Sequence, residues 1–325
     1  MHVLSCPHLP EAAQTPLGSE VYRGLTAPLK TLSPWLFYDA RGSELFEQIT
    51  ELPEYYPTRT ERSILSAHAD EIVAAAAGCE QLAMIELGAG TATKTGLLLK
   101  AAVKRQSEVT YHAIDVSGTA LDEAKQRIEA ELDGVAVVPR VADYTEGLGQ
   151  IEIDGHRRMV LYIGSSIGNF EPADALQLLR DIRKELKPGE KLLLGVDMVK
   201  DREILLNAYD DAAQVTAAFN KNVLTRINRE LGANFNLNLF RHRARWSEEC
   251  SRIEMHLESL IAQSVSIPEL ELEVKMQRGE TIHTENSYKF RDEGVIEMLE
   301  RADFHLSDHW TDEREWFGVY LATAW

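Results

Sequence analysis

The residues best suited to hold a ligand lie in one short stretch, from Glu86 to Lys94. Apolar residues precede Glu86, Gly88 and Gly90 follow it, and a helical pattern of apolar residues begins after Lys94. Glycine adopts the positive φ angles and the close backbone approach that a tight turn beside a ligand requires. A helix that starts after such a turn directs free N–H groups and the positive end of its dipole at the ligand. The stretch therefore predicts a strand, a ligand-binding turn and a helix.

The spacing of these residues narrows the choice of ligand. A dinucleotide-binding turn needs a third glycine three residues after the second, where this chain has Thr93, and the Gly-Lys-Ser/Thr ending of a P-loop is absent. The pattern Glu-x-Gly-x-Gly instead resembles motif I of the S-adenosylmethionine (SAM)-dependent methyltransferases, with Ala92 in place of a usual third glycine. Asp115 ends the next expected strand. Its separation in sequence from the glycines is the one at which an acid binds a ribose diol. The alternative is an ordinary glycine turn with an incidental Asp, but two acids in register favour SAM.

The charge of the chain limits its partners. Among its 325 residues, 34 are basic and 52 acidic, which gives a net charge of −18. Nucleic acids and anionic membranes are bound by clustered Lys and Arg, so neither is expected as a partner, and a small-molecule substrate fits better. The sequence has no run of about 18 apolar residues and no cleavable N-terminal signal. A soluble, cytoplasmic protein is therefore expected.

Cysteine and histidine give no sign of a metal site along the sequence. Cys6, Cys79 and Cys250 are few, odd in number and unpatterned, so neither a disulfide framework nor a zinc site is expected. The 10 histidines show no metal-ligand spacing with acids or cysteines. No metal is expected in the site.

Strands and helices alternate through the middle of the chain. Strands are expected at residues 82–87, 108–115, 135–141, 158–164 and 191–197, with helices between most of them. This alternation is typical of a parallel, doubly wound α/β sheet, in which ligands bind at the carboxyl ends of the strands. Five residues with suitable chemistry fall at that edge: Gly88, Asp115, Asp143, Gly164 and Asp197.

The pattern changes after Asp197. Residues 208–224 are expected to form one long helix, and residues 252–260 alternate with period two, as a half-buried strand does. A helix at 292–301 and a hairpin of 304–310 and 317–322 are expected to close the first sheet. We therefore expect two domains. Residues 60–199 plus 289–325 form the SAM-binding domain, and residues 1–59 plus 200–288 form a substrate-binding lid.

Five segments are distinctive: FYDARGS (37–43), LPEYYPTRTE (52–61), GSSIGN (164–169), AYDDA (208–212) and TENSYKF (284–290). Together they resemble the histidine-specific SAM-dependent methyltransferases, over essentially the whole chain from residue 20 onward. The resemblance implies a Rossmann-like class I methyltransferase domain with a second, α+β substrate-binding domain. It implies three successive methylations of the α-amine of L-histidine, through mono- and dimethyl intermediates, to the betaine hercynine, the first step of ergothioneine biosynthesis. A monomer is expected by resemblance only.

The resemblance also implies the residues of the site. It implies SAM contacts from Tyr38, Glu86, Gly88, Ala89, Gly90, Lys94, Asp115, Asp143 and Tyr144. It implies a histidine pocket of Tyr55, Asn169, Tyr209, Thr216, Met255, Glu285 and Ser287. Asn169, Tyr38 and Tyr209 are the residues assigned to catalysis.

The chemistry of methyl transfer gives these residues their roles. Transfer from a sulfonium is an in-line displacement, so catalysis depends on positioning and desolvation. The attacking α-amine must be neutral, although its pKa of about 8 keeps it mostly protonated near neutral pH. Asn169 and the hydroxyls of Tyr38 and Tyr209 can bind the substrate carboxylate and orient the amine without placing a full charge beside it. The sequence does not require a His or Lys side chain to act as the base. Aromatic faces such as those of Tyr38 and Phe46 can accommodate the quaternary product by cation–π attraction.

Recognition of the imidazole is expected from Glu285 and Ser287. Their spacing of two residues places both on the same side of an extended segment. A carboxylate accepts the ring N–H, and a hydroxyl serves the other nitrogen as donor or acceptor. Without the surrounding resemblance, an exposed acidic strand would be the simpler interpretation.

Three alternatives compete with this function. The first is an N-methyltransferase that acts on another amino acid or small amine, which a substrate panel would distinguish. The second is a methyltransferase-like protein that binds SAM or histidine without turnover. A nicotinamide-linked dehydrogenase is disfavoured because Thr93 replaces the third glycine.

Overall fold

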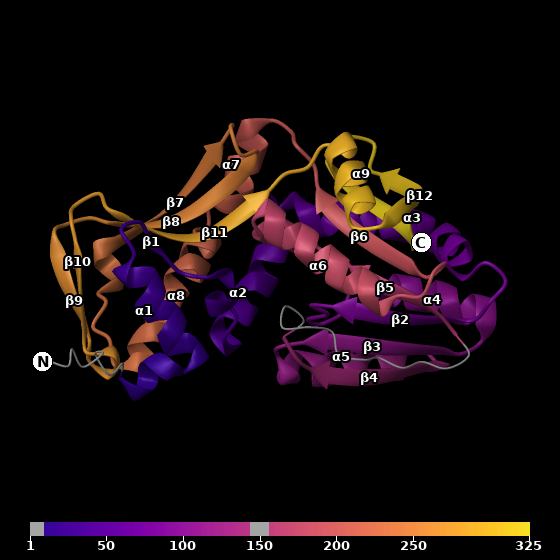
Figure 1. Cartoon of the computed structure of the whole chain (residues 1–325), viewed down its shortest axis with the longest axis horizontal. Coiled ribbons are helices and arrows are strands. Elements are labelled where there is room, and N and C mark those ends of the chain that lie inside the picture. The colour runs from indigo at the N-terminus through magenta and orange to yellow at the C-terminus, as the bar shows by residue number, and fades with distance from the viewer. Residues whose placement is uncertain (1–9, 144–155) are drawn as a thin grey trace, which may run out of the picture. The chain divides into compact units, whose positions relative to one another are not determined.

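The structure is a computed structural model that describes residues 10–143 and 156–325 (Figure 1). The chain forms two compact units, each made of two separate stretches of sequence. The central-sheet unit consists of Pro57–Lys200 and Tyr288–Trp325, and the insert unit consists of Met1–Tyr56 and Asp201–Ser287.

The central-sheet unit contains a seven-stranded sheet in the order β12-β13-β6-β5-β2-β3-β4. Its strands are β2 (Leu82–Leu87), β3 (Val109–Asp115), β4 (Val135–Val141), β5 (Arg157–Tyr162), β6 (Lys191–Asp197), β12 (Phe304–Thr311) and β13 (Phe317–Ala324). Strands β4, β3, β2, β5 and β6 pair in parallel, whereas β13 is antiparallel to both β6 and β12. The expected α/β class, with a parallel sheet closed by an antiparallel hairpin, is confirmed.

Helices cover both faces of this sheet, so the central strands β2 and β6 are buried along their whole length. Helices α3 (Tyr56–Ala77), α4 (Thr95–Gln106) and α5 (Gly118–Glu131) pack on one face, in a core that includes Met84. Helices α6 (Pro172–Glu185) and α9 (Asp292–Arg301) pack on the other, in a core that includes Ile85 (Figure 1). Successive side chains of β2 therefore enter opposite core layers.

The insert unit combines helices with two smaller sheets. One sheet has the strand order β1-β11-β8-β7, and the other pairs β10 with β9. Its strands are β1 (Lys30–Thr31), β7 (Phe240–Ser247), β8 (Arg252–Ser259), β9 (Gln263–Ile267), β10 (Leu272–Met276) and β11 (Thr281–Tyr288). Its α-helices are α1 (Pro16–Thr26), α2 (Ala40–Thr50), α7 (Arg202–Tyr209) and α8 (Val215–Leu231).

Short 3-10 helices connect these elements. In the insert unit they are η1 (Glu11–Gln14), η2 (Pro34–Phe37), η5 (Leu237–Leu239) and η6 (Pro268–Leu270), and η4 (Ser166–Asn169) follows β5 in the central-sheet unit. In the described part of the chain, no helix combines the length and the apolar character needed to cross a membrane.

The expectation of one helix over residues 208–224 is wrong. The structure ends α7 at Tyr209 and begins α8 at Val215. The carboxylate of Asp211 accepts hydrogen bonds from the N–H groups of Val215 at 2.9 Å and Thr216 at 2.8 Å. A carboxylate that caps a new helix competes with continuation of the previous one, so the chain breaks at this point.

Candidate functional site

The glycine turn after β2 is held by the end of β3. The N–H groups of Gly88 and Ala89 donate to the carbonyl oxygen of Ile114 at 2.9 and 3.0 Å. The N–H of Gly90 donates to Oδ2 of Asp115 at 2.9 Å, and Oδ1 of Asp115 accepts the N–H of Ser117 at 2.8 Å. Gly88 and Gly90 have φ angles of 69° and 51°, which favour glycine. The structure thus brings four expected SAM-binding residues, Gly88, Ala89, Gly90 and Asp115, into one hydrogen-bonded turn.

Space lies open above this turn. A Cβ atom built on Gly90 would meet no atom of the described chain within 4 Å. The Asp115 side chain is half-buried, and each carboxylate oxygen has lone pairs beyond the one used by the turn. The structure therefore leaves room for a ligand beside Gly90.

Glu86, the acid of the motif, is buried beneath the turn. Its carboxylate accepts hydrogen bonds from the hydroxyl of Thr95 at 2.6 Å and from the hydroxyl of Tyr111. Burial raises the pKa of the Glu86 carboxyl from 4.5 to about 7, against the lowering effect of these two hydrogen bonds. The side chain joins the start of α4 to β3, so in the structure it supports the turn from inside.

Lys94 connects the turn to a buried acid that the sequence analysis did not assign to the site. Its Nζ forms an ion pair with Glu61, which is fully buried at the start of α3. The other carboxylate oxygen of Glu61 accepts the N–H of Gly164 at 2.8 Å, just after β5. Glu61 thus ties Lys94 to the edge of the sheet. Its place at the end of the segment Leu52–Glu61, which carries the family resemblance, was the signal that could have identified it.

Two further expected residues of this unit, Asp143 and Asn169, lie at the same strand edge. Asp143 is exposed two residues beyond β4, and Tyr144 lies outside the described residues. Asn169 is half-buried at the end of η4, after β5. The carboxyl ends of β2, β3, β4 and β5 therefore carry the expected residues of the central-sheet unit, as a ligand site on a doubly wound sheet requires.

In the insert unit, aromatic rings bring together three expected residues. The ring of Tyr38 lies 5.9 Å from that of Phe46, and the ring of Phe46 lies 6.3 Å from that of Tyr55. The ring of Tyr55 in turn lies 6.2 Å from that of Tyr209. All three pairs meet edge to face, one of the arrangements that aromatic rings prefer. We call Tyr38, Phe46, Tyr55 and Tyr209 the aromatic cluster.

Tyr209 links this cluster to β11. Its hydroxyl lies 2.7 Å from the hydroxyl of Ser287, and both side chains are buried. The carbonyl oxygen of Tyr209 accepts a hydrogen bond from Nε2 of His242 at 2.7 Å, which anchors the end of α7 on β7. Glu285 lies two residues before Ser287 and is half-buried. The expected pair of imidazole-binding residues therefore lies on the strand that contacts the aromatic cluster.

Met255 and Thr216 are also buried in the insert unit. Met255 lies on β8, and its carbonyl oxygen accepts the hydroxyl of Thr284 at 3.0 Å. Thr216 lies in the first turn of α8, and its hydroxyl oxygen is buried without a hydrogen-bond partner in the described part of the chain. A buried polar atom without a partner costs free energy, so this hydroxyl is suited to receive a polar ligand.

The sequence is similar to proteins of described function. A family model described as "Histidine-specific methyltransferase, SAM-dependent" matches residues 17–324. The histidine N-alpha-methyltransferase of Mycolicibacterium smegmatis is 46% identical over 96% of this chain and 96% of that protein. The histidine N-alpha-methyltransferase of Mycobacterium tuberculosis is 43% identical over 99% of each chain. The ergothioneine biosynthesis protein 1 of Schizosaccharomyces pombe is 28% identical over 89% of this chain and 38% of that protein.

Proposed function

Because the chain belongs to the histidine-specific, SAM-dependent methyltransferases, we propose that it methylates the α-amino nitrogen of L-histidine three times to give hercynine. This reaction is the first step of ergothioneine biosynthesis. The observation that carries the proposal is the similarity, along almost the whole chain, to two mycobacterial histidine N-alpha-methyltransferases. The methyl groups come from SAM, whose sulfonium supplies an activated methyl when it is bound.

The glycine turn is the proposed SAM site. The open space above Gly90 leaves room for the ligand, and the N–H groups that hold Asp115 also fix the direction of its carboxylate. We assign the ribose diol to Asp115, since a carboxylate that already accepts backbone N–H groups keeps lone pairs for two hydroxyls. Lys94 and Asp143 are proposed as further SAM contacts at the same edge, and Tyr38 and Tyr144 are also proposed as SAM contacts. Glu86 supports the site from beneath.

The insert unit carries most of the residues of the proposed histidine pocket, and Asn169 is a further proposed histidine-binding residue. Glu285 is assigned to the imidazole N–H and Ser287 to the other ring nitrogen, because a carboxylate only accepts and a hydroxyl can do both. Met255 contributes an apolar wall, and the buried hydroxyl of Thr216 offers a polar contact. The aromatic cluster then provides ring faces for the methylated amine.

Catalysis in this proposal comes from position and surroundings. A cluster made of aromatic rings and neutral hydroxyls brings no full negative charge to the amine, so it favours the neutral, nucleophilic form. Asn169, Tyr38 and Tyr209 orient the amine and the carboxylate of the substrate. As each methyl replaces an N–H, the lost hydrogen bond is offset by attraction between the growing cation and the aromatic faces.

Further parts of the proposal concern the protein as a whole. The central-sheet unit is the SAM-binding domain, and the insert unit is the substrate-binding lid. A monomer in the cytoplasm that binds neither nucleic acid nor membrane is proposed, in keeping with the net charge of −18. Sedimentation of the purified chain measures the monomeric state directly.

The experiment that tests the function is mass spectrometry of the 20 common amino acids after incubation with SAM and the enzyme. We expect a mass shift of three methyl groups on histidine alone. Methylation of another amino acid would keep the SAM site and overturn the histidine pocket. SAM binding without methylation of any substrate would favour a binding protein, and absence of SAM binding would overturn the proposal as a whole.

A further inference from the structure

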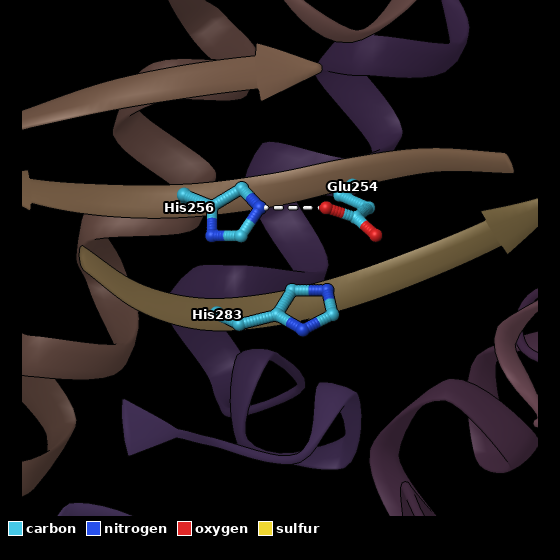
Figure 2. A group of neighbouring side chains, drawn as sticks. All are labelled: Glu254, His256 and His283. Atoms are coloured by element: carbon cyan, nitrogen blue, oxygen red, sulfur yellow. Dashed lines mark hydrogen bonds and ion pairs between the residues drawn. The ribbon is translucent and has the colours of Figure 1, made fainter. Parts of the chain in front are cut away.

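Three side chains with metal-binding groups meet on the sheet of the insert unit. Glu254 and His256 lie on β8, and His283 lies on the neighbouring strand β11 (Figure 2). One potential ligand atom from each residue lies within 4.8 Å of the others. The two imidazole rings stack with their centroids 4.7 Å apart and their planes 22° apart. Nε2 of His256 lies 3.1 Å from a carboxylate oxygen of Glu254 (Figure 2).

One ring nitrogen of His256 is left without a hydrogen-bond partner among the described residues, which suits a further ligand. His256 is 7% exposed, and this nitrogen is its Nδ1. Nε2 of His283 lies 3.0 Å from the carbonyl oxygen of Glu285. A contact between one ring nitrogen and a backbone carbonyl is the usual way in which a metal-binding imidazole is oriented for coordination through the other nitrogen.

The carboxylate of Glu254 directs its two oxygens at different partners. Arg252 occupies one carboxylate oxygen, and the other faces His256.

We propose that Glu254, His256 and His283 form a site for one divalent transition-metal ion of the zinc class, which links β8 to β11. Two imidazoles and one carboxylate are a ligand set that proteins use for zinc. Around a tetrahedral zinc with bonds of about 2.1 Å, ligand atoms lie about 3.4 Å apart. The three groups therefore need to approach one another by about 1.4 Å at most to reach these separations.

The role of such an ion follows from its place on the sheet. Met255 lies between Glu254 and His256, so its side chain leaves β8 on the opposite face. The ion would then lie on the face of β8 away from Met255 and would hold two strands together. This inference does not depend on the proposed function, because its test requires no methylation.

This cluster could not be predicted from the order of residues along the chain. Glu254 and His256 are two residues apart, but His283 joins them only because β11 lies beside β8 in the sheet. A two-ligand spacing without a third ligand nearby in sequence is too common to indicate a metal.

The test is metal binding by the full-length protein after treatment with a chelator. Zn²⁺ is titrated in competition with a chromogenic chelator, and Co²⁺ is used in parallel because its absorption spectrum reports the ligand atoms. The variants are Glu254→Gln and His283→Gln, and the matched control is His305→Gln, an exposed histidine of the central-sheet unit. Far-UV circular dichroism and melting without metal show that each variant folds.

We expect one Zn²⁺ per chain in the wild type and in His305→Gln. Each ligand variant should bind Zn²⁺ more weakly by a factor of at least about 10 to 100. Loss of a residue that only hydrogen-bonds a metal ligand already has an effect of this size. Zn²⁺ should raise the melting temperature of the wild type but not of the ligand variants. The proposal is overturned if the wild type binds no stoichiometric Zn²⁺, or if Glu254→Gln and His283→Gln bind as the wild type does. A Co²⁺ spectrum with thiolate charge-transfer bands would assign the ion to cysteine and would also overturn it.

Discussion

Nζ of Lys289 lies 2.8 Å from Oδ2 of Asp197, with both side chains almost completely buried. The other carboxylate oxygen of Asp197 lies 2.5 Å from Nζ of Lys200. Lys200 and Lys289 lie beside the two points where the chain passes between the central-sheet unit and the insert unit. Asp197 therefore fastens both connecting segments to the end of β6.

Replacing Asp197 with Asn should destabilise the protein strongly, because two buried ammonium groups would lose their counter-charge. We expect a loss of about 3–5 kcal/mol in the free energy of unfolding at pH 7, measured by urea denaturation. The matched control is Asp70→Asn, which removes an ion pair with Lys104 whose side chains are 65% and 71% exposed. That change should cost about 1 kcal/mol or less. Equal effects of the two substitutions would contradict the role of Asp197.

The same ion pairs predict the pH dependence of stability. Burial alone would raise the pKa of Asp197, but Lys289 and Lys200 lower it below its ordinary value of 3.8. A carboxyl with a lowered pKa stabilises the fold above its unfolded pKa, and this contribution is lost as the pH falls through the folded pKa. The difference in unfolding free energy between wild type and Asp197→Asn should therefore shrink as the pH is lowered below 3.8.

The hydrogen bond between Tyr209 and Ser287 should be measurable as a coupling energy. Tyr209→Phe and Ser287→Ala each leave a buried hydroxyl without its partner, whereas the double variant removes both hydroxyls. We expect a coupling of about 0.5–1.5 kcal/mol in a double-mutant cycle of unfolding free energies. Ser264→Ala, at an exposed hydroxyl of β9, is the control and should show no coupling to Tyr209→Phe. Additive effects of Tyr209→Phe and Ser287→Ala would show that the two hydroxyls do not interact.

The central sheet could be predicted from the sequence because its strands are local, apolar and separated by helices. Leu82–Leu87, Val135–Val141 and Lys191–Asp197 have the expected bounds. Strand β7 was not assigned, since arginine occupies every second position from Arg241 to Arg245 and only Phe240 among its buried residues is strongly apolar. A strand whose outer face is charged and whose inner face holds His242 has too weak an apolar alternation to be recognised.

The site was predictable only where chemistry is encoded by neighbours in sequence. The glycines and Asp115 follow directly from strand ends, so their proximity could be expected. The contacts of Glu61 could not be predicted, because its bonds to Lys94 and Gly164 join three elements separated by long stretches of chain. For the same reason, the stacking of His256 on His283 could not be predicted from the sequence. Contacts formed by sheet order and helix packing depend on the whole fold, whereas motifs depend on a few consecutive residues.

Glu285→Ala should weaken histidine binding and leave SAM binding unchanged. The lost interaction is a hydrogen bond to a charged group, for which about 1.5–3 kcal/mol is expected. Calorimetric titration with histidine and, separately, with SAM measures both affinities. Glu273→Ala, an acid of β10 in the same unit, is the control and should change neither affinity. An unchanged affinity for histidine would remove Glu285 from the pocket.

Asp115→Asn should show the opposite pattern, with weaker SAM binding and unchanged histidine binding. Asparagine has one acceptor oxygen for the two backbone N–H groups that Asp115 holds, so circular dichroism and melting must show that the variant keeps its fold. We expect SAM affinity to fall by about 1.5–3 kcal/mol, as for a charged hydrogen bond. Loss of histidine affinity with intact SAM affinity would break the assignment of the two ligands to their residues.

Glu86 makes a prediction about stability at higher pH that is opposite in sign to that for Asp197. Its folded pKa is raised to about 7 from 4.5, so the folded protein holds this proton more tightly than the unfolded chain. The stability that it contributes is complete below pH 4.5 and is lost as the pH rises toward about 7. The shift corresponds to roughly 3 kcal/mol over this interval.

Gln at position 86 can accept hydrogen bonds from Thr95 and Tyr111 without ionising. As the pH rises from 5 to 8, the free energy of unfolding of Glu86→Gln should therefore increase relative to that of the wild type, by up to roughly this amount. Glu313→Gln, at an exposed position, is the control for the titration of ordinary carboxyls. Urea denaturation at a series of pH values measures the difference, and a constant gap between Glu86→Gln and the wild type would mean that Glu86 titrates as an ordinary acid and is not held neutral beneath the turn.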